Sequence, residues 1–248
     1  MRLTRVHTAA PLLAGALLAL EERIGTHLVR VLRLAPGAPL AIFDGRGHEH
    51  AATIESVKGA RVAVRVGAAL EVTPESQLAI TLVQCVSRSE RMDFVIQKAT
   101  ELGVARIVPL LTERSVVKLD ERQALAKHEH WQGVASAACE QSGRATLPVI
   151  EVPRRLIDYL AADREPAPAG TLKAVLVPGA DAGFHDVPTP LAAARLIVGP
   201  EGGLSDEENA LALGAGFTAL RLGPRVLRTE TAAAAAVAVL QALRGDLL

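Results

Sequence analysis

Two Gly/Pro-rich loops near the C-terminus carry side chains that could hold or stabilise charge. They are GPEGG (199–203) and the start of LGPRVLRTETA (222–232). Glycine lets the backbone approach a ligand closely, and free loop N–H and C=O groups can hydrogen-bond an adenine or ribose edge. Arg225 and Arg228, placed together in such a loop, indicate a site for an anion or for developing negative charge.

Each of these features also has a structural explanation. Thr229 can cap the final helix, and Glu230 would then lie in its first turn, where the helix dipole favours an acidic side chain. An arginine–carboxylate pair would account for Arg225 and Arg228, and a plain tight turn would account for GPEGG. Phosphate binding by the usual motifs is unsupported, because the sequence has no GxGxxG after the first strand and no GxxxxGK[ST].

The apolar pattern predicts that these loops follow strands of an α/β domain with a mostly parallel sheet. It predicts buried strands over 78–85, 105–111, 173–179 and 194–200, a strand at FTALRLG, and helices over 91–103, 120–140, DEENALALGAG and TETAAAAAVAVLQALRG (229–245). Ligands of open α/β sheets lie beyond the carboxyl ends of the strands. We therefore expect VPG (177–179), GPEGG and LGPR to lie at one edge.

The first part of the chain has a different pattern. VRVLRL (29–34), PLAIFD (39–44), HEHAATIESV (48–57) and ARVAVRVG (60–67) alternate apolar and polar residues, which predicts a small antiparallel sheet or barrel. A linker at VTPESQ then separates two domains, residues 1–72 and 73–248. The apolar segment 9–20 is too short to span a membrane and is predicted to form a buried loop and short helix. EPAPAGT (165–171) is predicted to be a surface loop.

Composition excludes some classes of protein. The 248 residues include 27 Lys/Arg and 27 Asp/Glu, so overall charge gives no nucleic-acid signature. Residues 1–72 carry nine Lys/Arg against six Asp/Glu, a small basic excess. Cys85 and Cys139 suggest neither a disulfide framework nor a zinc site, and we expect buried, reduced thiols. We expect no metal and no membrane partner.

Five segments together resemble one family. They are THLVRVLRLAPG (26–37), SERMDFVIQKATELGV (89–104), CEQSGRATLPVI (139–150), IVGPEGGLSDEE (197–208) and LRLGPRVLRTETAAAAAV (220–237). Their order and spacing resemble the RsmE family, the 16S ribosomal RNA uridine N3-methyltransferases of the SPOUT superfamily. The resemblance covers nearly the whole chain. Arg88 stands where the family often has Lys, and Leu204 where Phe is common; both substitutions keep the residue character.

The resemblance implies an α/β fold in which a PUA-like β-barrel (1–72) precedes a SPOUT domain (73–248) with a C-terminal trefoil knot. It implies a cytoplasmic homodimer whose cofactor, S-adenosylmethionine, lies in the knot. Carried over by position, the implied cofactor-binding residues are Val177, Pro178, Gly179, Gly199, Pro200, Glu201, Gly202, Gly203, Leu222, Gly223, Arg225, Leu227 and Arg228.

The implied reaction is methylation of uridine N3 in 16S rRNA of the assembled 30S subunit. Arg228 is the candidate for stabilising charge on the base, and Glu230 and Glu201 are the candidate general bases. Candidate RNA contacts are Arg5, Arg30, Arg33, Arg88, Arg91 and Lys98. Two alternatives stay open: a methyltransferase acting on tRNA or 23S rRNA, and a non-catalytic RNA-binding or assembly protein.

Overall fold

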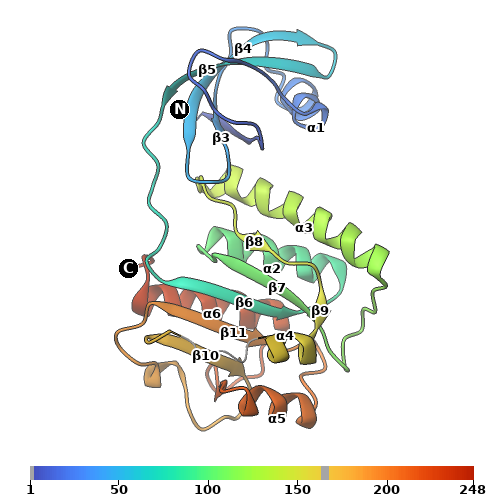
Figure 1. Cartoon of the computed structure of the whole chain (residues 1–248), viewed down its shortest axis with the longest axis vertical. Coiled ribbons are helices and arrows are strands. Elements are labelled where there is room, and N and C mark those ends of the chain that lie inside the picture. Colours follow the sequence, from blue (N-terminus) through green and yellow to red (C-terminus); the bar gives the residue numbers. More distant parts are fainter. Residues whose placement is uncertain (1–2, 163–167) are drawn as a thin grey trace. The chain divides into compact units, whose positions relative to one another are not determined.

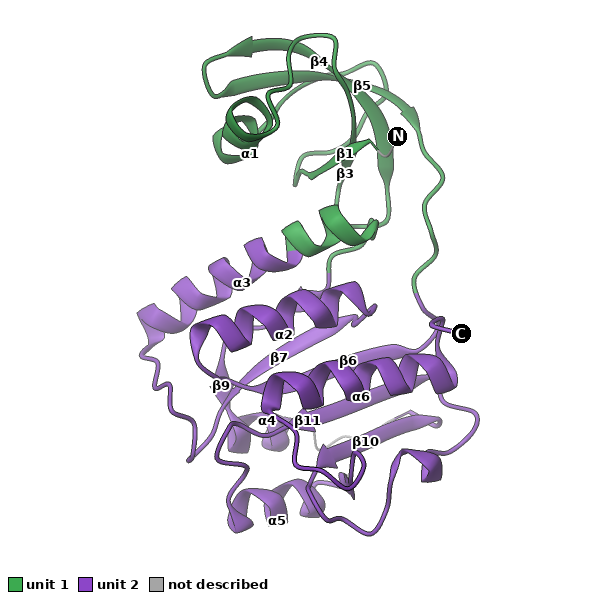
Figure 2. Ribbon diagram, turned by 180° about the vertical axis from the view of Figure 1, so that it is seen from behind, with its two compact units in different colours: residues 1–75, 136–147 green, residues 76–135, 148–248 purple. Residues whose placement is uncertain are grey.

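The computed structural model describes residues 3–162 and 168–248, which form two compact units (Figure 2). Unit 1 comprises residues 1–75 and 136–147, and unit 2 comprises residues 76–135 and 148–248. The predicted domain boundary at residue 72 falls near the end of the first segment. The sequence did not indicate that residues 136–147 belong to unit 1. Residues 165–167 of the predicted EPAPAGT loop lie outside the described residues.

Unit 1 is built on a five-stranded mixed sheet. Its strands are β1 (Thr4–His7), β2 (Leu17–Ala19), β3 (Pro39–Phe43), β4 (Glu49–Lys58) and β5 (Arg61–Ala69), in the order β1-β3-β4-β5-β2. Val62, Val64 and Val66 of β5 are buried in alternation with more exposed neighbours, so one face of the sheet covers the core. The strands predicted over 39–44, 48–57 and 60–67 are confirmed.

Three details of unit 1 differ from the predictions. Residues 29–34 are not a strand, because α1 (Glu22–Thr26) continues into a π-helical turn, η1 (His27–Val31). Ile24 and Leu28 are both buried in the core, and this helical spacing outweighs the alternation of the following residues. Within the segment 9–20, Leu17–Ala19 form β2 and no helix is present, and Leu17 is 57% exposed. The sheet is not wholly antiparallel, since β1 pairs with β3 in parallel.

Unit 2 is an α/β domain with a parallel sheet (Figure 1). The strands are β6 (Ala79–Cys85), β7 (Arg106–Leu111), β8 (Val149–Ile150), β9 (Arg154–Arg155), β10 (Thr171–Leu176), β11 (Ala193–Val198) and β12 (Thr218–Leu220). The helices are α2 (Ser89–Glu101), α4 (Leu156–Ala162), α5 (Asp206–Gly214), α6 (Thr229–Arg244) and the 3-10 turn η2 (Phe184–Asp186). Helix α3 (Glu121–Ser142) begins in unit 2, and its residues from 136 onward belong to unit 1. The predicted alternation of strands and helices is confirmed. The short elements β8, β9 and α4 had no sequence signal.

Helices cover both faces of this sheet. On one face, α2 and α6 lie side by side, as Figures 1 and 2 both show, and pack on Ile80 and Leu82 of β6. On the other face, α4 and α5 pack over a second cluster that includes Val83 and Cys85. The alternation along β6 therefore sends successive side chains to different cores.

The strand order β12-β10-β11 positions the loops of interest. These three strands are neighbours and run in parallel, so their carboxyl ends meet at the same edge of the sheet. They end at Leu220, Leu176 and Val198, and each is followed directly by one of the three predicted loops. The fold thus brings segments around 177, 199 and 222 together, as the sequence predicted.

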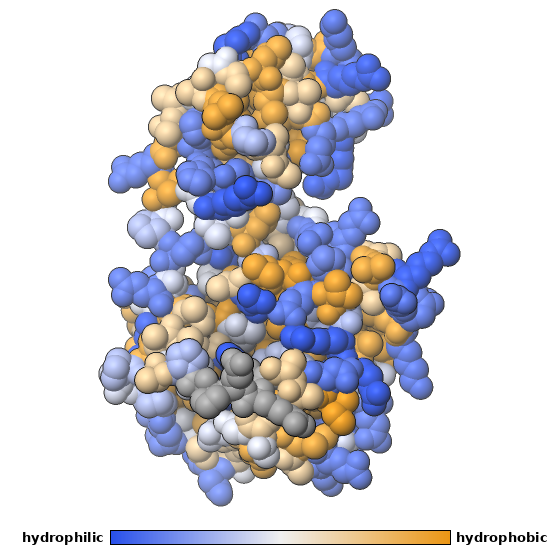
Figure 3. Space-filling view, in the orientation of Figure 1, coloured by the Kyte–Doolittle hydropathy of each residue, from blue (hydrophilic) through white to orange (hydrophobic). Residues whose placement is uncertain are grey.

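Both cysteines are free and buried, as predicted. Burial raises the pKa of the Cys85 thiol well above its usual range and raises the pKa of Cys139 to about 11. Neither thiol is therefore a reactive thiolate at neutral pH. Figure 3 shows a face on which hydrophilic and apolar side chains are interspersed in small patches.

Candidate functional site

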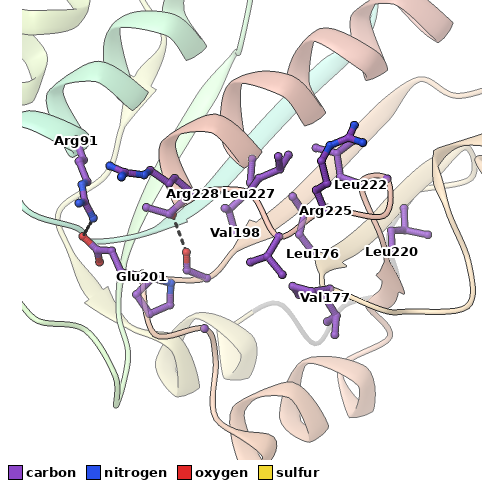
Figure 4. A pocket seen from close by; sticks show the side chains of 18 residues that line it. Arg91, Leu176, Val177, Val198, Glu201, Leu220, Leu222, Arg225, Leu227 and Arg228 are labelled. Carbon is purple, nitrogen blue, oxygen red and sulfur yellow. Dashed lines mark hydrogen bonds and ion pairs between the residues drawn. The ribbon is translucent and has the colours of Figure 1, made fainter.

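A cavity of about 340 Å³ lies where the three loops meet (Figure 4). This volume is at the lower end of the range for small-molecule sites. Its lining residues are Arg91, Leu176, Val177, Pro178, Val198, Gly199, Pro200, Glu201, Gly203, Leu220, Leu222, Gly223, Arg225, Val226, Leu227, Arg228, Thr229 and Ala232. The lining includes every predicted cofactor residue except Gly179 and Gly202, which lie in the same loops.

The GPEGG loop is held in its turn by a hydrogen bond within the loop and by hydrogen bonds from another segment. The Gly203 N–H donates to the Pro200 carbonyl at 2.9 Å, and Gly203 has a φ of 69°, in the left-handed region that favours glycine. Nη1 of Arg114, from the segment after β7, lies 3.3 Å from both the Gly202 and Leu204 carbonyl oxygens. Ser205 and Glu208 form a capping box that starts α5 directly after the loop.

The third loop presents two arginines to the cavity. Arg225 and Arg228 both line it and both are exposed, and in Figure 4 their side chains extend in opposite directions. Arg228 is the N-cap residue of α6, so its side chain stands at the positive end of the helix dipole. A guanidinium at this place adds to a positive potential that favours an anion or a developing negative charge.

Three charged residues meet at the side of the cavity. Nη1 of Arg91, from α2, lies 2.9 Å from Oε1 of Glu201, and its Nε lies 3.8 Å from Oε1 of Glu230. Glu201 lines the cavity, whereas Glu230 does not. Glu230 Oε2 is buried and has no hydrogen-bond partner within the described part of the chain. The two candidate bases therefore differ: only Glu201 faces the cavity.

The hydroxyl of Thr229 does not cap α6, although the sequence suggested that it could. Thr229 is the first residue of the helix, and its Oγ1 donates at 2.7 Å to the Gly199 carbonyl of the GPEGG loop. Nε2 of Gln84, at the end of β6, donates to the same Oγ1 at 2.9 Å. The hydroxyl thus joins α6 to the GPEGG loop and to the central strand.

Arg5 is the predicted RNA contact that the structure contradicts. Its side chain is 7% exposed and pairs with Glu49 through both Nε and Nη2 at 2.8 Å. The remaining donors reach the carbonyls of Cys139, Glu140 and Arg144, and the guanidinium stacks 4.7 Å from the Phe43 ring centroid. With its donors used inside unit 1, Arg5 ties residues 136–147 to the sheet and has none left for phosphate.

The other predicted RNA contacts fall into two groups. Arg30, Arg33 and Arg88 are exposed, and Arg33 has a φ of 55°, which holds its backbone in a left-handed turn. Arg91 points to the carboxylates of Glu201 and Glu230, and Lys98 pairs with Glu101 on its own helix at 2.8 Å. The structure thus places Arg91 beside two acidic residues at the side of the cavity, where the sequence had predicted a contact with RNA.

Sequence reasoning missed Gln84 and Arg114. Gln84 left one signal, since it is the polar residue at the end of the apolar run LAITLVQC and is fully buried. Arg114 left none, because an arginine in a polar loop is ordinary. Both support the GPEGG loop from elements that lie far from it in the sequence.

Within residues 3–162 and 168–248, no group of three or more His, Cys, Asp and Glu side chains is arranged to hold a metal ion. In the same residues, no helix is both long and apolar enough to cross a membrane. A second cavity, of about 660 Å³, is larger but lies elsewhere, beside α4 and α5. Its lining residues include Glu208 and Leu211 of α5 and none from the three loops that enclose the first cavity.

Comparison with known families gives two matches. Residues 74–241 match the family of RNA methyltransferase domains, and residues 20–66 match the RNA methyltransferase PUA domain. The two matches fall in the order that the resemblance implied. Together they confirm the predicted fold class, a PUA-like domain followed by a SPOUT-type methyltransferase domain.

Individual relatives agree. The chain is 30% identical to the ribosomal RNA small subunit methyltransferase E of Buchnera aphidicola, over 99% of this chain and 98% of that one, and 33% identical to that of Mycobacterium bovis, over 90% and 85%. A candidate methyltransferase from Legionella pneumophila in complex with S-adenosylmethionine matches with a TM-score of 0.94 at 44% identity. A ribosomal RNA small subunit methyltransferase E from Neisseria gonorrhoeae bound to S-adenosylmethionine matches with a TM-score of 0.90 at 36% identity. Each structure match covers 100% of both chains. The chain therefore belongs to the ribosomal RNA small subunit methyltransferase E family, the RsmE family of RNA methyltransferases.

Proposed function

We propose that this protein transfers a methyl group from S-adenosylmethionine to N3 of one uridine in the 16S rRNA of the assembled 30S subunit. The observation that carries the proposal is the cavity at the ends of β10, β11 and β12, enclosed by three loops that match the family motifs. Relatives named as ribosomal RNA small subunit methyltransferases, and two similar structures that contain S-adenosylmethionine, support it.

The cavity fits such a cofactor. Leu176, Val198, Leu220 and Leu227 give it an apolar wall suited to an adenine ring, and the glycine-containing loops leave backbone groups close to the cavity. The proposed binding residues are Val177, Pro178, Gly179, Gly199, Pro200, Glu201, Gly202, Gly203, Leu222, Gly223, Arg225, Leu227 and Arg228. The bound cofactor supplies a methyl group on a positively charged sulfur, which is already activated and requires no metal.

The protein has to make uridine N3 nucleophilic. N3 carries a proton at neutral pH, and its removal leaves negative charge shared with O2 and O4 of the base. Arg228 stands at the cavity and at the N-terminus of α6, where it can stabilise that charge. In the proposed reaction the methyl group would pass from the sulfur to N3, and the sulfur would keep the electron pair of the broken bond. The N3 proton would pass to a base of the protein.

Glu201 is the better candidate for accepting that proton. It is the acidic side chain among the described cavity-lining residues, whereas Glu230 does not line the cavity and lies 3.8 Å from Arg91 Nε. Arg91 holds the Glu201 carboxylate in place through the 2.9 Å contact. In this arrangement Glu230 is a positioning residue that holds the other side of the Arg91 guanidinium.

Arg30, Arg33 and Arg88 are the proposed RNA contacts that remain exposed. They would bind phosphates and so position the substrate without reading its sequence. The near-zero net charge fits a substrate recognised as an assembled particle. As the resemblance implies, we propose a homodimer that acts in the cytoplasm, where ribosomal subunits mature.

The test is transfer of labelled methyl from S-adenosylmethionine to unmodified 30S subunits, with naked 16S rRNA, 23S rRNA and tRNA assayed in parallel. Reverse-transcription stops map the modified position. We expect label at a single uridine of 16S rRNA, and only in the subunit. Label on tRNA or 23S rRNA would keep the enzyme class and overturn the substrate. Binding of RNA without any methyl transfer would favour the non-catalytic alternative.

A further inference from the structure

Gln84 is a buried glutamine that the proposed reaction does not use. It follows Ile80 and Leu82 on the face of β6 that packs under α2 and α6, and it is 0% exposed. Its Oε1 is buried without a hydrogen-bond partner among the described residues. An apolar side chain would fill this place and leave no unsatisfied oxygen, so packing alone gives no reason for a glutamine.

The orientation of the Gln84 amide is fixed by its neighbours. One of its terminal atoms lies 3.0 Å from the Cys85 carbonyl oxygen, which can only accept a hydrogen bond. The atom facing that oxygen must therefore be Nε2, and Oε1 must point away. The second Nε2 hydrogen then goes to Thr229 Oγ1 at 2.9 Å.

This orientation also fixes the direction of the next hydrogen bond. Because Thr229 Oγ1 accepts from Gln84, its own proton is left for the Gly199 carbonyl oxygen, 2.7 Å away. The chain of donors therefore runs one way, from Gln84 through Thr229 to Gly199. It joins the central strand, the start of α6 and the GPEGG loop.

Thr229 and Gly199 both line the cavity, and Thr229 follows Arg228 directly. The hydroxyl is not used to cap α6, although a Ser or Thr at a helix start ordinarily serves that purpose. A Cβ built on Gly199 would lie 3.3 Å from the Leu204 backbone nitrogen, so the loop is also tightly folded at this point. The geometry sets the spacing between the second and third loops.

We propose that Gln84 and Thr229 are positioning residues that lock the GPEGG loop against the Arg228 loop and so preform the S-adenosylmethionine site. This inference rests on the proposed function, which assigns that cofactor to the cavity. Gln84 itself does not line the cavity and acts through Thr229.

The test compares Thr229→Val, which keeps the shape and removes the hydroxyl, with Thr229→Ser, which keeps the hydroxyl. Gln84→Met removes the first donor, and Thr100→Val is the control, since Thr100 is also buried but its hydroxyl donates to the Ile96 carbonyl within α2. Calorimetry gives the Kd for S-adenosylmethionine of each full-length variant, and thermal unfolding gives its Tm.

We expect Thr229→Val and Gln84→Met each to raise the Kd about tenfold, the loss of one well-placed hydrogen bond. The double variant should be no worse than either single one, because the two residues act as a unit. Thr229→Ser and Thr100→Val should bind within about twofold of the wild type. Gln84→Met should keep its Tm, since it also removes the unsatisfied Oε1.

Unchanged affinity in Thr229→Val would overturn the proposal, as would additive losses in the double variant. Hydrogen exchange of the backbone amides of residues 199 and 201–204 is a second measurement that needs no ligand. Exchange should be faster in Thr229→Val than in Thr229→Ser. Equal exchange rates would count against the role of the Gln84–Thr229–Gly199 hydrogen bonds. If the wild-type protein failed to bind S-adenosylmethionine, the proposed function would be wrong. The exchange rates would still show whether the Gln84–Thr229–Gly199 hydrogen bonds hold the loop.

Discussion

Burial separates arginines that look alike in the sequence. Arg5 and Arg228 were both predicted to meet RNA or its reacting base. Arg5 is enclosed by Glu49 and by the backbone of residues 139–144, so it stabilises unit 1. Arg228 is exposed, lines the cavity and stands at a helix N-terminus. The residue type indicated charge binding in both cases, and only the surroundings decide which charge is bound.

At this scale we predict the effect of removing the Arg228 guanidinium. Arg228→Ala should lower turnover about a hundredfold or more, because a preorganised donor is worth about 3 kcal/mol in the transition state. The Kd for S-adenosylmethionine should change little, because the proposed contacts of this loop with the cofactor are made by backbone groups, which the substitution keeps. Single-turnover methylation and calorimetry measure the two effects. Arg225→Ala is the matched control, and turnover that fell equally in both variants would deny Arg228 its special role.

The elements position the site through their ends. Three neighbouring parallel strands deliver three loops to one edge, and α5 and α6 begin directly after the second and third loops. The GPEGG loop is further held by Arg114 from the segment after β7. The loop conformation therefore depends on several elements, and its glycines supply the backbone angles that the turn requires.

At the scale of the element we predict that the left-handed turn at Gly203 matters for cofactor binding. Gly203→Ala places a Cβ at a φ of 69°, which costs about 1 kcal/mol and should raise the Kd for S-adenosylmethionine several-fold. Gly214→Ala, in α5 without a positive φ, is the control and should leave the Kd unchanged while raising the Tm slightly. Equal affinity of the two variants would show that the turn tolerates a side chain without consequence.

For the whole molecule, the distribution of charged residues along the chain is more informative than the net charge. The 27 basic and 27 acidic residues cancel, yet residues 1–72 carry a basic excess, and Arg30 and Arg33 are exposed within it. Arg65 lies in the same unit but pairs with Glu55 at 3.0 Å. A phosphate-binding role is therefore expected of some arginines in unit 1 and not of others.

Salt dependence tests this at the scale of the molecule. Arg33→Ala should weaken binding to 30S subunits and reduce the slope of log K against log salt concentration by about one, the loss of one phosphate contact. Arg65→Ala should leave the slope unchanged. Filter binding at several salt concentrations measures both, and an Arg33 variant with the wild-type slope would remove that residue from the RNA interface.

Local sequence patterns were enough to predict the α/β domain and the place of the cavity. Alternation of strands and helices predicted the α/β domain, and glycine-rich segments after predicted strands located the cavity, because strand ends and tight turns are written in short stretches of sequence. The family resemblance, carried by five motifs, was confirmed by the comparisons. The expectation of a trefoil knot came from that resemblance alone, since no local pattern encodes how a chain threads.

Only the tertiary structure decided which partner each polar group has. Gln84 and Thr229 are 145 positions apart, Arg91 and Glu201 are 110, and Arg5 bonds a carbonyl 134 positions away. A side chain's hydrogen bond depends on what the fold packs beside it, and the sequence around it carries no record of that neighbour. For the same reason residues 29–31 form part of a π-helical turn where alternation predicted a strand, and residues 136–147 belong to unit 1.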